Sequence, residues 1–87
     1  VFVQASAYEG HPKTVLEAMA TGAAVLVTDT LGLGRVVDHG RTGLRCASEV
    51  RAIARGLRWL LADEGLRRRL GRCARTAAAS LHVDRVA

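Results

Sequence analysis

Two glutamates near the start of the chain, Glu9 and Glu17, are the residues whose type and spacing best suit ligand chemistry. Glu17 follows Glu9 by eight positions, and Gly10 comes directly after Glu9. Gly10 permits a sharp turn and leaves backbone N–H groups uncovered, and a helix that begins after it directs further unpaired N–H groups at an anion. Carboxylates accept hydrogen bonds from hydroxyl groups. Two carboxylates beside a group of N–H donors therefore suit a ligand that carries both phosphate and sugar hydroxyls.

The elements that must position these residues are predicted to form a strand–helix–strand unit. Val1–Val3 and Ala24–Val27 are continuous apolar runs, which predict strands buried on both faces of a parallel sheet. Between them, Pro12 suits the first position of a helix because its missing N–H costs nothing there, and Gly22 is expected to end that helix. Open parallel sheets bind ligands at the carboxyl ends of their strands, and the glutamate segment follows such an end.

The same residues also have purely structural interpretations. Glu9 is a favourable negative charge before a helix N-terminus, worth about 0.3–1 kcal/mol. Glu17 lies one helical turn after Lys13 and is a solvated partner for it, worth a few tenths of a kcal/mol. Thr28 and Asp29 end the second apolar run, where they either contact a ligand or cap the following turn.

The rest of the chain is predicted to add one strand and two helices. His39–Gly43 predicts a tight turn into a short strand at Leu44–Cys46. Ser48 is expected to cap a helix that runs to about Ala62, and Asp63 or Glu64 is expected to open another. The side chains expected to face the core are Val50, Ile53, Ala54, Leu57, Leu60 and Leu61 in the first helix, and Leu66, Leu70, Cys73, Ala77 and Leu81 in the second.

These elements divide the chain into a βαβ unit, residues 1–47, and a helical segment, residues 48–87. The fold class they predict is α/β, a parallel Rossmann-like sheet flanked by helices. Two or three parallel strands leave a sheet edge with a row of unpaired backbone groups. The chain is therefore expected to be part of a larger α/β domain.

Composition excludes several classes of protein. The chain has 87 residues, of which 49% are hydrophobic, and this is too apolar for a disordered segment. Its apolar runs fall far short of the roughly 18 residues that a membrane span needs. Two cysteines, Cys46 and Cys73, are too few for a disulfide framework, and we expect free thiols, a reducing compartment and no metal site.

The net charge of +5 is carried by the helical segment, residues 48–87. Its densest part is the run Arg67, Arg68, Arg69, Arg72 and Arg75. No aromatic residues are interleaved there to stack on bases, so nucleic acid is not an expected partner. An anionic membrane surface is a partner that this run allows. A non-catalytic basic module that binds anionic partners is therefore the alternative from another functional class.

The ordered set of motifs resembles one enzyme family. Glu9, Gly10, Pro12, Glu17 and the following Ala-Met-Ala and Gly22 match the signature of family 4 retaining glycosyltransferases of GT-B fold, in which two glutamates are separated by seven residues. The resemblance continues through Thr28-Asp29, a glycine loop, Val36-Val37 and Thr42-Gly43-Leu44, and reaches nearly to the end of the chain. It implies the C-terminal, donor-binding domain of such an enzyme, in part.

The resemblance implies a role for each matched residue. The position of Glu9 contacts hydroxyls of the transferred sugar and is the catalytic position, and that of Glu17 accepts from the ribose hydroxyls of the nucleotide. Backbone groups of the segment between them line the sugar and the diphosphate. The implied donor-binding residues are Glu9, Gly10, His11, Pro12, Lys13, Thr14 and Glu17. The family usually has an aromatic residue where His11 stands, so this side chain is placed to approach the donor sugar.

The resemblance also implies partners and a location. The donor is a nucleotide-diphosphate sugar, and the reaction retains the anomeric configuration with no metal and no further cofactor. The N-terminal acceptor domain of the same parent protein is the missing partner, so the isolated chain is expected to be inactive. A cytoplasmic location is expected, with peripheral attachment at the inner face of the membrane as a variant of it. An epimerase or phosphorylase related to the GT-B fold is a further alternative.

Overall fold

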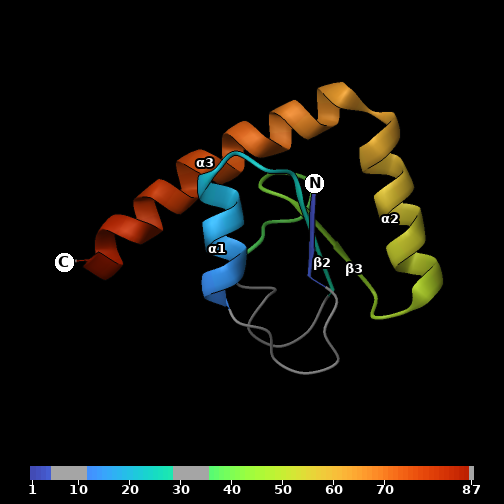
Figure 1. The fold of residues 1–87 in the computed structure, drawn as a ribbon, viewed down its shortest axis with the longest axis horizontal. Helices are drawn as coiled ribbons and strands as arrows, with labels where there is room; N and C mark the ends of the chain where they lie inside the picture. Colours follow the sequence, from blue (N-terminus) through green and yellow to red (C-terminus); the bar gives the residue numbers. More distant parts are fainter. Residues whose placement is uncertain (5–11, 29–35, 87) are drawn as a thin grey trace.

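The computed structural model describes the backbone of residues 1–4, 12–28 and 36–86, and the side chains of these residues except 12, 13 and 81–86. The elements follow one another as strand β1, helix α1, strands β2 and β3, and helices α2 and α3 (Figure 1). Their bounds are β1 Phe2–Gln4, α1 Pro12–Ala20, β2 Val25–Thr28, β3 Leu44–Cys46, α2 Val50–Ala62 and α3 Glu64–Val86.

The three strands form one parallel sheet in the order β1-β2-β3, which confirms the predicted fold class. Every residue of the central strand β2 is buried, because helices cover both of its faces. The prediction for β1 was wrong in one respect. Its side chains are half-buried or exposed, with Val3 38% exposed, since β1 is an edge strand of the described sheet and only one of its faces is well covered.

Two apolar layers hold the sheet between the helices. On one face, Val15 and Met19 of α1 pack with Val25 and Val27 of β2. On the other face, Leu26 of β2 packs with side chains of β3, α2 and α3. Successive residues of β2 thus point to opposite layers, as the alternation of side chains along a strand requires. In Figure 1, α1 and α2 flank the strands on the two sides.

Helix α3 belongs to both layers. Leu66 and Leu70 pack in the layer of α2, while Ala74 and Ala78 pack in the layer of α1. The helix passes over the amino ends of the strands, from one layer to the other (Figure 1). We expected Cys73 and Ala77 on the buried side, but the structure buries the residues that follow each of them and leaves these two half-buried. The side chain of Leu81 lies outside the described residues.

Helix α2 is less buried than its apolar pattern predicted. Leu60 is fully buried, whereas Val50 is 84% exposed and Leu61 is 61% exposed. Val50 begins the helix, and Leu61 follows the buried Leu60 and so points away from its face by about 100°. The cap residue also differs from the prediction, because the N-cap is Glu49 rather than Ser48 and makes no side-chain capping hydrogen bond.

The predicted bounds of α1 and the predicted start of α3 are confirmed. Helix α1 begins at Pro12 and ends at Ala20, after which Gly22 adopts a left-handed conformation with φ of +83°. The N–H of Gly22 donates to the carbonyl of Met19 at 2.9 Å. Helix α3 is preceded by Asp63, whose carboxylate accepts from the N–H of Leu66 at 2.9 Å.

Candidate functional site

The carboxyl ends of β1 and β2 lie at the same level of the sheet. The parallel register places Gln4, the last residue of β1, beside Val27, the residue before the end of β2. Helix α1 connects these two parallel strands and therefore runs in the opposite direction to them. It begins near their carboxyl ends. Figure 1 shows the start of α1 at this edge and its end at the opposite edge.

The first turn of α1 presents backbone donors at this edge. The first N–H groups of an α-helix have no partner within the helix, and Pro12 at the first position has no N–H to satisfy. The N–H groups of Lys13 and Thr14 are thus the first available donors, and the side chain of Thr14 is exposed. Such a helix start favours a bound anion through both the donors and the helix dipole.

Glu17 lies on the exposed face of α1. Val15 and Met19 are fully buried, and at 100° per residue Glu17 points nearly opposite to both of them. Its exposed carboxylate is available to a ligand hydroxyl and equally to the solvent. Geometry therefore keeps both interpretations of this residue open.

Part of the predicted site lies outside the described residues. This holds for Glu9, Gly10 and His11 entirely, and for the side chains of Pro12 and Lys13. Of the predicted site, the structure therefore places the first turn of α1, with Thr14, near the carboxyl ends of the strands, and Glu17 on the same helix. The arrangement of the two glutamates around a common hollow stays a prediction.

The end of β2 is buried. Thr28 is 1% exposed, and its Cα partner in the register is Cys46 of β3. The Thr28 side chain is thus not accessible from the surface, and the turn that it was predicted to cap lies outside the described residues. Asp29 lies outside the described residues.

A cleft of mixed polar and apolar lining, which the sequence did not reveal, lies between α3 and the turn before β3. Its volume is about 620 Å³, and Asp38, Arg41, Arg45 and Thr76 contribute polar groups to it. The turn is held by a hydrogen bond from the Asp38 N–H to the Thr42 hydroxyl at 2.8 Å and by an ion pair between Asp38 and Arg41 at 3.7 Å. No sequence motif marks this cleft, because its two walls are about thirty residues apart in the chain.

The turn itself forms as predicted. Gly40 has φ of +81°, and its N–H donates to the carbonyl of Gly43 at 2.8 Å. His39 accepts from the N–H of Arg45 through Nδ1 at 2.8 Å, so its ring fastens the turn to β3.

The described part of the chain contains neither a cluster of metal ligands nor a membrane-spanning helix. Within residues 1–4, 12–28 and 36–86, no three side chains of His, Cys, Asp or Glu come together as metal ligands would. The helices α1, α2 and α3 include none that is long and apolar enough to cross a membrane.

Comparison with known proteins places this geometry in a family. Residues 1–77 match the model of the family described as glycosyl transferases group 1. Glycogen synthase from two strains of Mycobacterium tuberculosis is 37% identical to the chain over 71 residues, which cover 80% of the chain and 17% of the relative. The chain therefore spans about a sixth of the length of these curated relatives.

Two solved structures share the fold. Sucrose-phosphate synthase from Thermosynechococcus elongatus superposes with a TM-score of 0.85 at 28% identity, over 97% of this chain and 23% of that chain. The C-terminal domain of a glycosyl transferase group 1 family protein from Francisella tularensis superposes with a TM-score of 0.82 at 26% identity, over 92% of this chain and 42% of that chain. The sheet and helices are thus those of part of a GT-B C-terminal domain, and the chain belongs to the glycosyl transferases group 1 family.

Proposed function

We propose that this chain is part of the nucleotide-sugar donor site of a retaining glycosyltransferase of family 4. The observation that carries the proposal is the start of α1 at the carboxyl edge of the parallel sheet, with Pro12 at its first position and Glu17 exposed on it. Family membership supports a transferase in the parent protein. The names of the relatives, a glycogen synthase and a sucrose-phosphate synthase, fit sugar transfer.

In this proposal each end of the donor has its own partners. Glu9 accepts from hydroxyls of the transferred sugar, and Glu17 accepts from the ribose hydroxyls of the nucleotide. The backbone N–H groups of Gly10, His11, Lys13 and Thr14 donate to the sugar and to the diphosphate, and the fixed φ of Pro12 starts the helix that aims them.

The reaction breaks the bond between the anomeric carbon and the diphosphate oxygen, and the electron pair leaves with the diphosphate. The acceptor hydroxyl forms the new bond on the same face of the sugar, and its proton passes to the departing diphosphate oxygen. Preorganised N–H donors at the start of α1 stabilise the negative charge that develops on the departing diphosphate. The acceptor and the basic side chains that complete this stabilisation come from other parts of the parent protein.

The experiment that tests this proposal is the substitution Glu17→Ala in the complete parent protein. A carboxylate that accepts from two ribose hydroxyls contributes charge-assisted hydrogen bonds, each worth about 1.5–3 kcal/mol. We therefore expect donor affinity, measured by calorimetry against a panel of nucleotide-diphosphate sugars, to fall roughly 10-fold or more. The substitution removes an exposed side chain, so the melting temperature should be unchanged.

Glu49→Ala is the matched control. Glu49 is also exposed, and as the N-cap of α2 it makes no side-chain capping hydrogen bond. Its removal changes the net charge equally and should leave donor affinity intact. Unchanged donor binding in the Glu17 variant would contradict the proposed site. Product analysis by NMR completes the test, because an inverted anomer would contradict retention, and an epimerised or phosphorolysed sugar would indicate one of the related reactions instead.

A further inference from the structure

We propose a second anion site, for a phosphate-bearing ligand, in the cleft between the end of α1 and the middle of α3. The cleft has a volume of about 460 Å³. It lies near the amino ends of the strands, at the end of α1 and not at its start. Its lining residues are Thr21, Gly22, Arg68, Gly71, Arg72 and Arg75. This proposal goes beyond the donor site, because it uses none of the residues assigned there.

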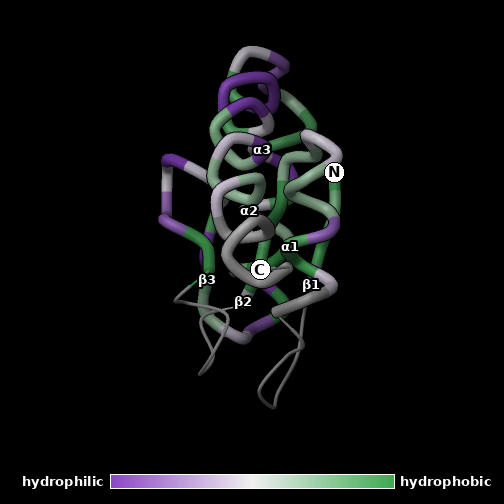
Figure 2. The backbone as a smooth tube through the Cα atoms, turned by 90° about the vertical axis from the view of Figure 1, so that its left-hand side faces the viewer, coloured by the Kyte–Doolittle hydropathy of each residue, from purple (hydrophilic) through white to green (hydrophobic). Residues whose placement is uncertain are grey.

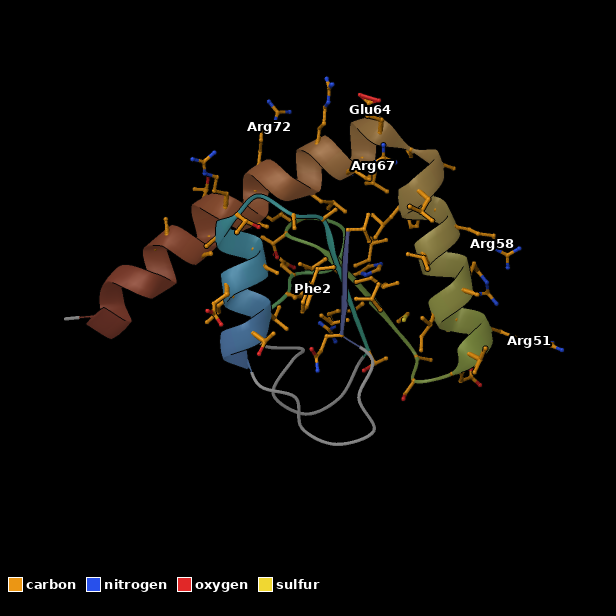
Figure 3. The ribbon with its side chains drawn as sticks, in the orientation of Figure 1. Phe2, Arg51, Arg58, Glu64, Arg67 and Arg72 are labelled. Atoms are coloured by element: carbon orange, nitrogen blue, oxygen red, sulfur yellow. The ribbon has the colours of Figure 1, made fainter. Side chains whose placement is uncertain are left out.

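The three arginines lie on one face of α3 because of their spacing. Arg72 follows Arg68 by four residues and Arg75 follows Arg72 by three, so their side chains share one face of α3. Neighbours at these spacings have Cβ atoms about 5–6 Å apart, which lets one phosphate group contact two guanidinium groups. Figure 3 shows Arg72 projecting from α3 away from the sheet.

The positive charge of the cleft is largely uncompensated. Arg68 forms an ion pair with Glu64 at 2.8 Å. Arg72 and Arg75 are exposed, and among the described side chains they have no carboxylate partner. Figure 2 shows the arginine-rich turns of α3 as a hydrophilic stretch. Planar guanidinium groups bind phosphate oxygens in a bidentate manner, so a phosphate supplies the counter-charge that the described residues lack.

The wall opposite to the arginines is the turn after α1, and its carbonyl groups have hydrogen-bond donors without the arginines. The carbonyl of Ala18 accepts from the N–H groups of Thr21 and Ala23 at 3.2 and 3.3 Å, and from the Thr21 hydroxyl at 2.7 Å. The carbonyl of Met19 accepts from Gly22. The turn after α1 therefore satisfies these carbonyls from within, and the guanidinium groups of α3 remain available to a ligand.

Gly22 and Gly71 form the base of the cleft, where their backbones are in close contact. A Cβ built on Gly71 would collide with the carbonyl of Gly22, so the turn after α1 and helix α3 meet backbone to backbone at this point. A Cβ built on Gly22 would meet only the Cδ atom of Arg75 and the carbonyl oxygen of Gly71, each at 4.0 Å. The Cδ atom of Arg75 thus lies near the glycine turn, at the side of the cleft.

The test compares two double variants of the complete parent protein. Arg72→Ala with Arg75→Ala removes two cleft arginines, and Arg51→Ala with Arg58→Ala removes two exposed arginines that project outward from α2 (Figure 3). Both variants lose the same net charge. Pyrophosphate is titrated by calorimetry at constant ionic strength, and a nucleotide-diphosphate sugar is titrated against the same variants and against Glu17→Ala, so that the donor site is measured separately from the cleft.

We expect the Arg72/Arg75 variant to bind pyrophosphate about tenfold more weakly, since it loses charge-assisted contacts that solvent partly screens. The Arg51/Arg58 variant should bind like the wild type. The corresponding double lysine variant should bind with intermediate affinity, because lysine keeps the charge and loses the bidentate geometry. Nucleotide-sugar affinity should depend on Glu17 and not on Arg72 or Arg75, so each proposal can fail without the other.

The source of the phosphate is distinguished by sedimentation with vesicles. Phosphatidylcholine vesicles with and without phosphatidic acid are compared for the same variants. Arginine-dependent binding to the acidic vesicles assigns the site to a lipid headgroup, and pyrophosphate binding without vesicle binding assigns it to a free phosphate-bearing ligand. Both results support the site. Equal losses in the two double variants, pyrophosphate binding that is unchanged in the Arg72/Arg75 variant, or no binding of either probe would overturn it.

Discussion

Replacing Gly71 by alanine tests the close contact between α1 and α3. Gly71 lies within helix α3 and does not have a positive φ, so alanine is compatible with its backbone conformation. The obstacle is steric. The new Cβ would lie 3.2 Å from the carbonyl carbon of Gly22 and closer still to its oxygen. These are backbone atoms of a turn that the hydrogen bond from Gly22 to Met19 holds in place, so they cannot rotate out of the way.

The expected free-energy change follows from opposing effects. Overpacking typically costs about 1–3 kcal/mol, and weakening the Gly22–Met19 hydrogen bond adds about 1 kcal/mol. The better helix propensity of alanine returns about 1 kcal/mol. We therefore expect a net destabilisation of about 1–3 kcal/mol, seen as a lower midpoint in denaturation of the parent protein followed by far-UV circular dichroism.

Gly65→Ala in the same helix is the control. Gly65 is exposed, and a Cβ there would have only an ordinary contact with Asp63 Oδ1 at 3.4 Å. The helix-propensity gain then acts without a clash, so this variant should be as stable as the wild type or more stable by up to about 1 kcal/mol. If the Gly71 variant proved as stable as the Gly65 variant, the backbone contact between α1 and α3 would be refuted.

Two further predictions concern the core and the sheet edge. Leu70→Ala should destabilise the protein by about 2–5 kcal/mol because Leu70 is fully buried, whereas Leu61→Ala should change stability by no more than about 0.5 kcal/mol because Leu61 is 61% exposed; equal effects in chemical denaturation would refute the assigned layers. The N–H of Phe2 donates to the carbonyl of Ala24, beside β2, so the N–H of the next residue, Val3, points away from β2. If a further strand of the parent protein pairs with this side of β1, the Val3 amide should exchange its hydrogen slowly in the parent protein and fast in the 87-residue chain alone. Fast exchange in both would show that no further strand covers β1.

Local signals in the sequence were enough to predict the elements around the site. Pro12 and Gly22 act through their own backbone preferences, so the bounds of α1 follow from two residues. The apolar run at β2 requires burial on both faces, and the structure provides it. The same argument failed for β1, because the burial of an edge strand depends on what lies beyond the edge, and this is not encoded in the strand itself.

The buried face of α3 shows why a longer helix was harder to predict. Its buried apolar side chains, Leu66, Leu70, Ala74 and Ala78, recur every four positions, and each such step turns the face by about 40°. This slow rotation suits a helix that passes from the layer of α2 to that of α1. A stripe with mixed spacing, as predicted through Cys73 and Ala77, would face one layer only. The cleft lined by Arg68, Arg72 and Arg75 could not be predicted for a similar reason. Gly22 and Gly71 are far apart in the chain and come together only because α3 passes over the end of α1.

Helix α1 separates the two proposed anion sites, and its length bears on whether they interact. Its nine residues extend over about 13 Å at 1.5 Å per residue, which exceeds the Debye length of about 8 Å at physiological ionic strength. Direct repulsion between a diphosphate at the start of α1 and a phosphate at its end is therefore largely screened. Any dependence of donor affinity on the cleft would have to act through packing, and the backbone contact of Gly22 with Gly71 is the contact in the cleft that joins α1 to α3. Since Gly71→Ala disturbs this contact without removing a charge, a change in donor affinity in that variant would indicate mechanical coupling rather than electrostatics.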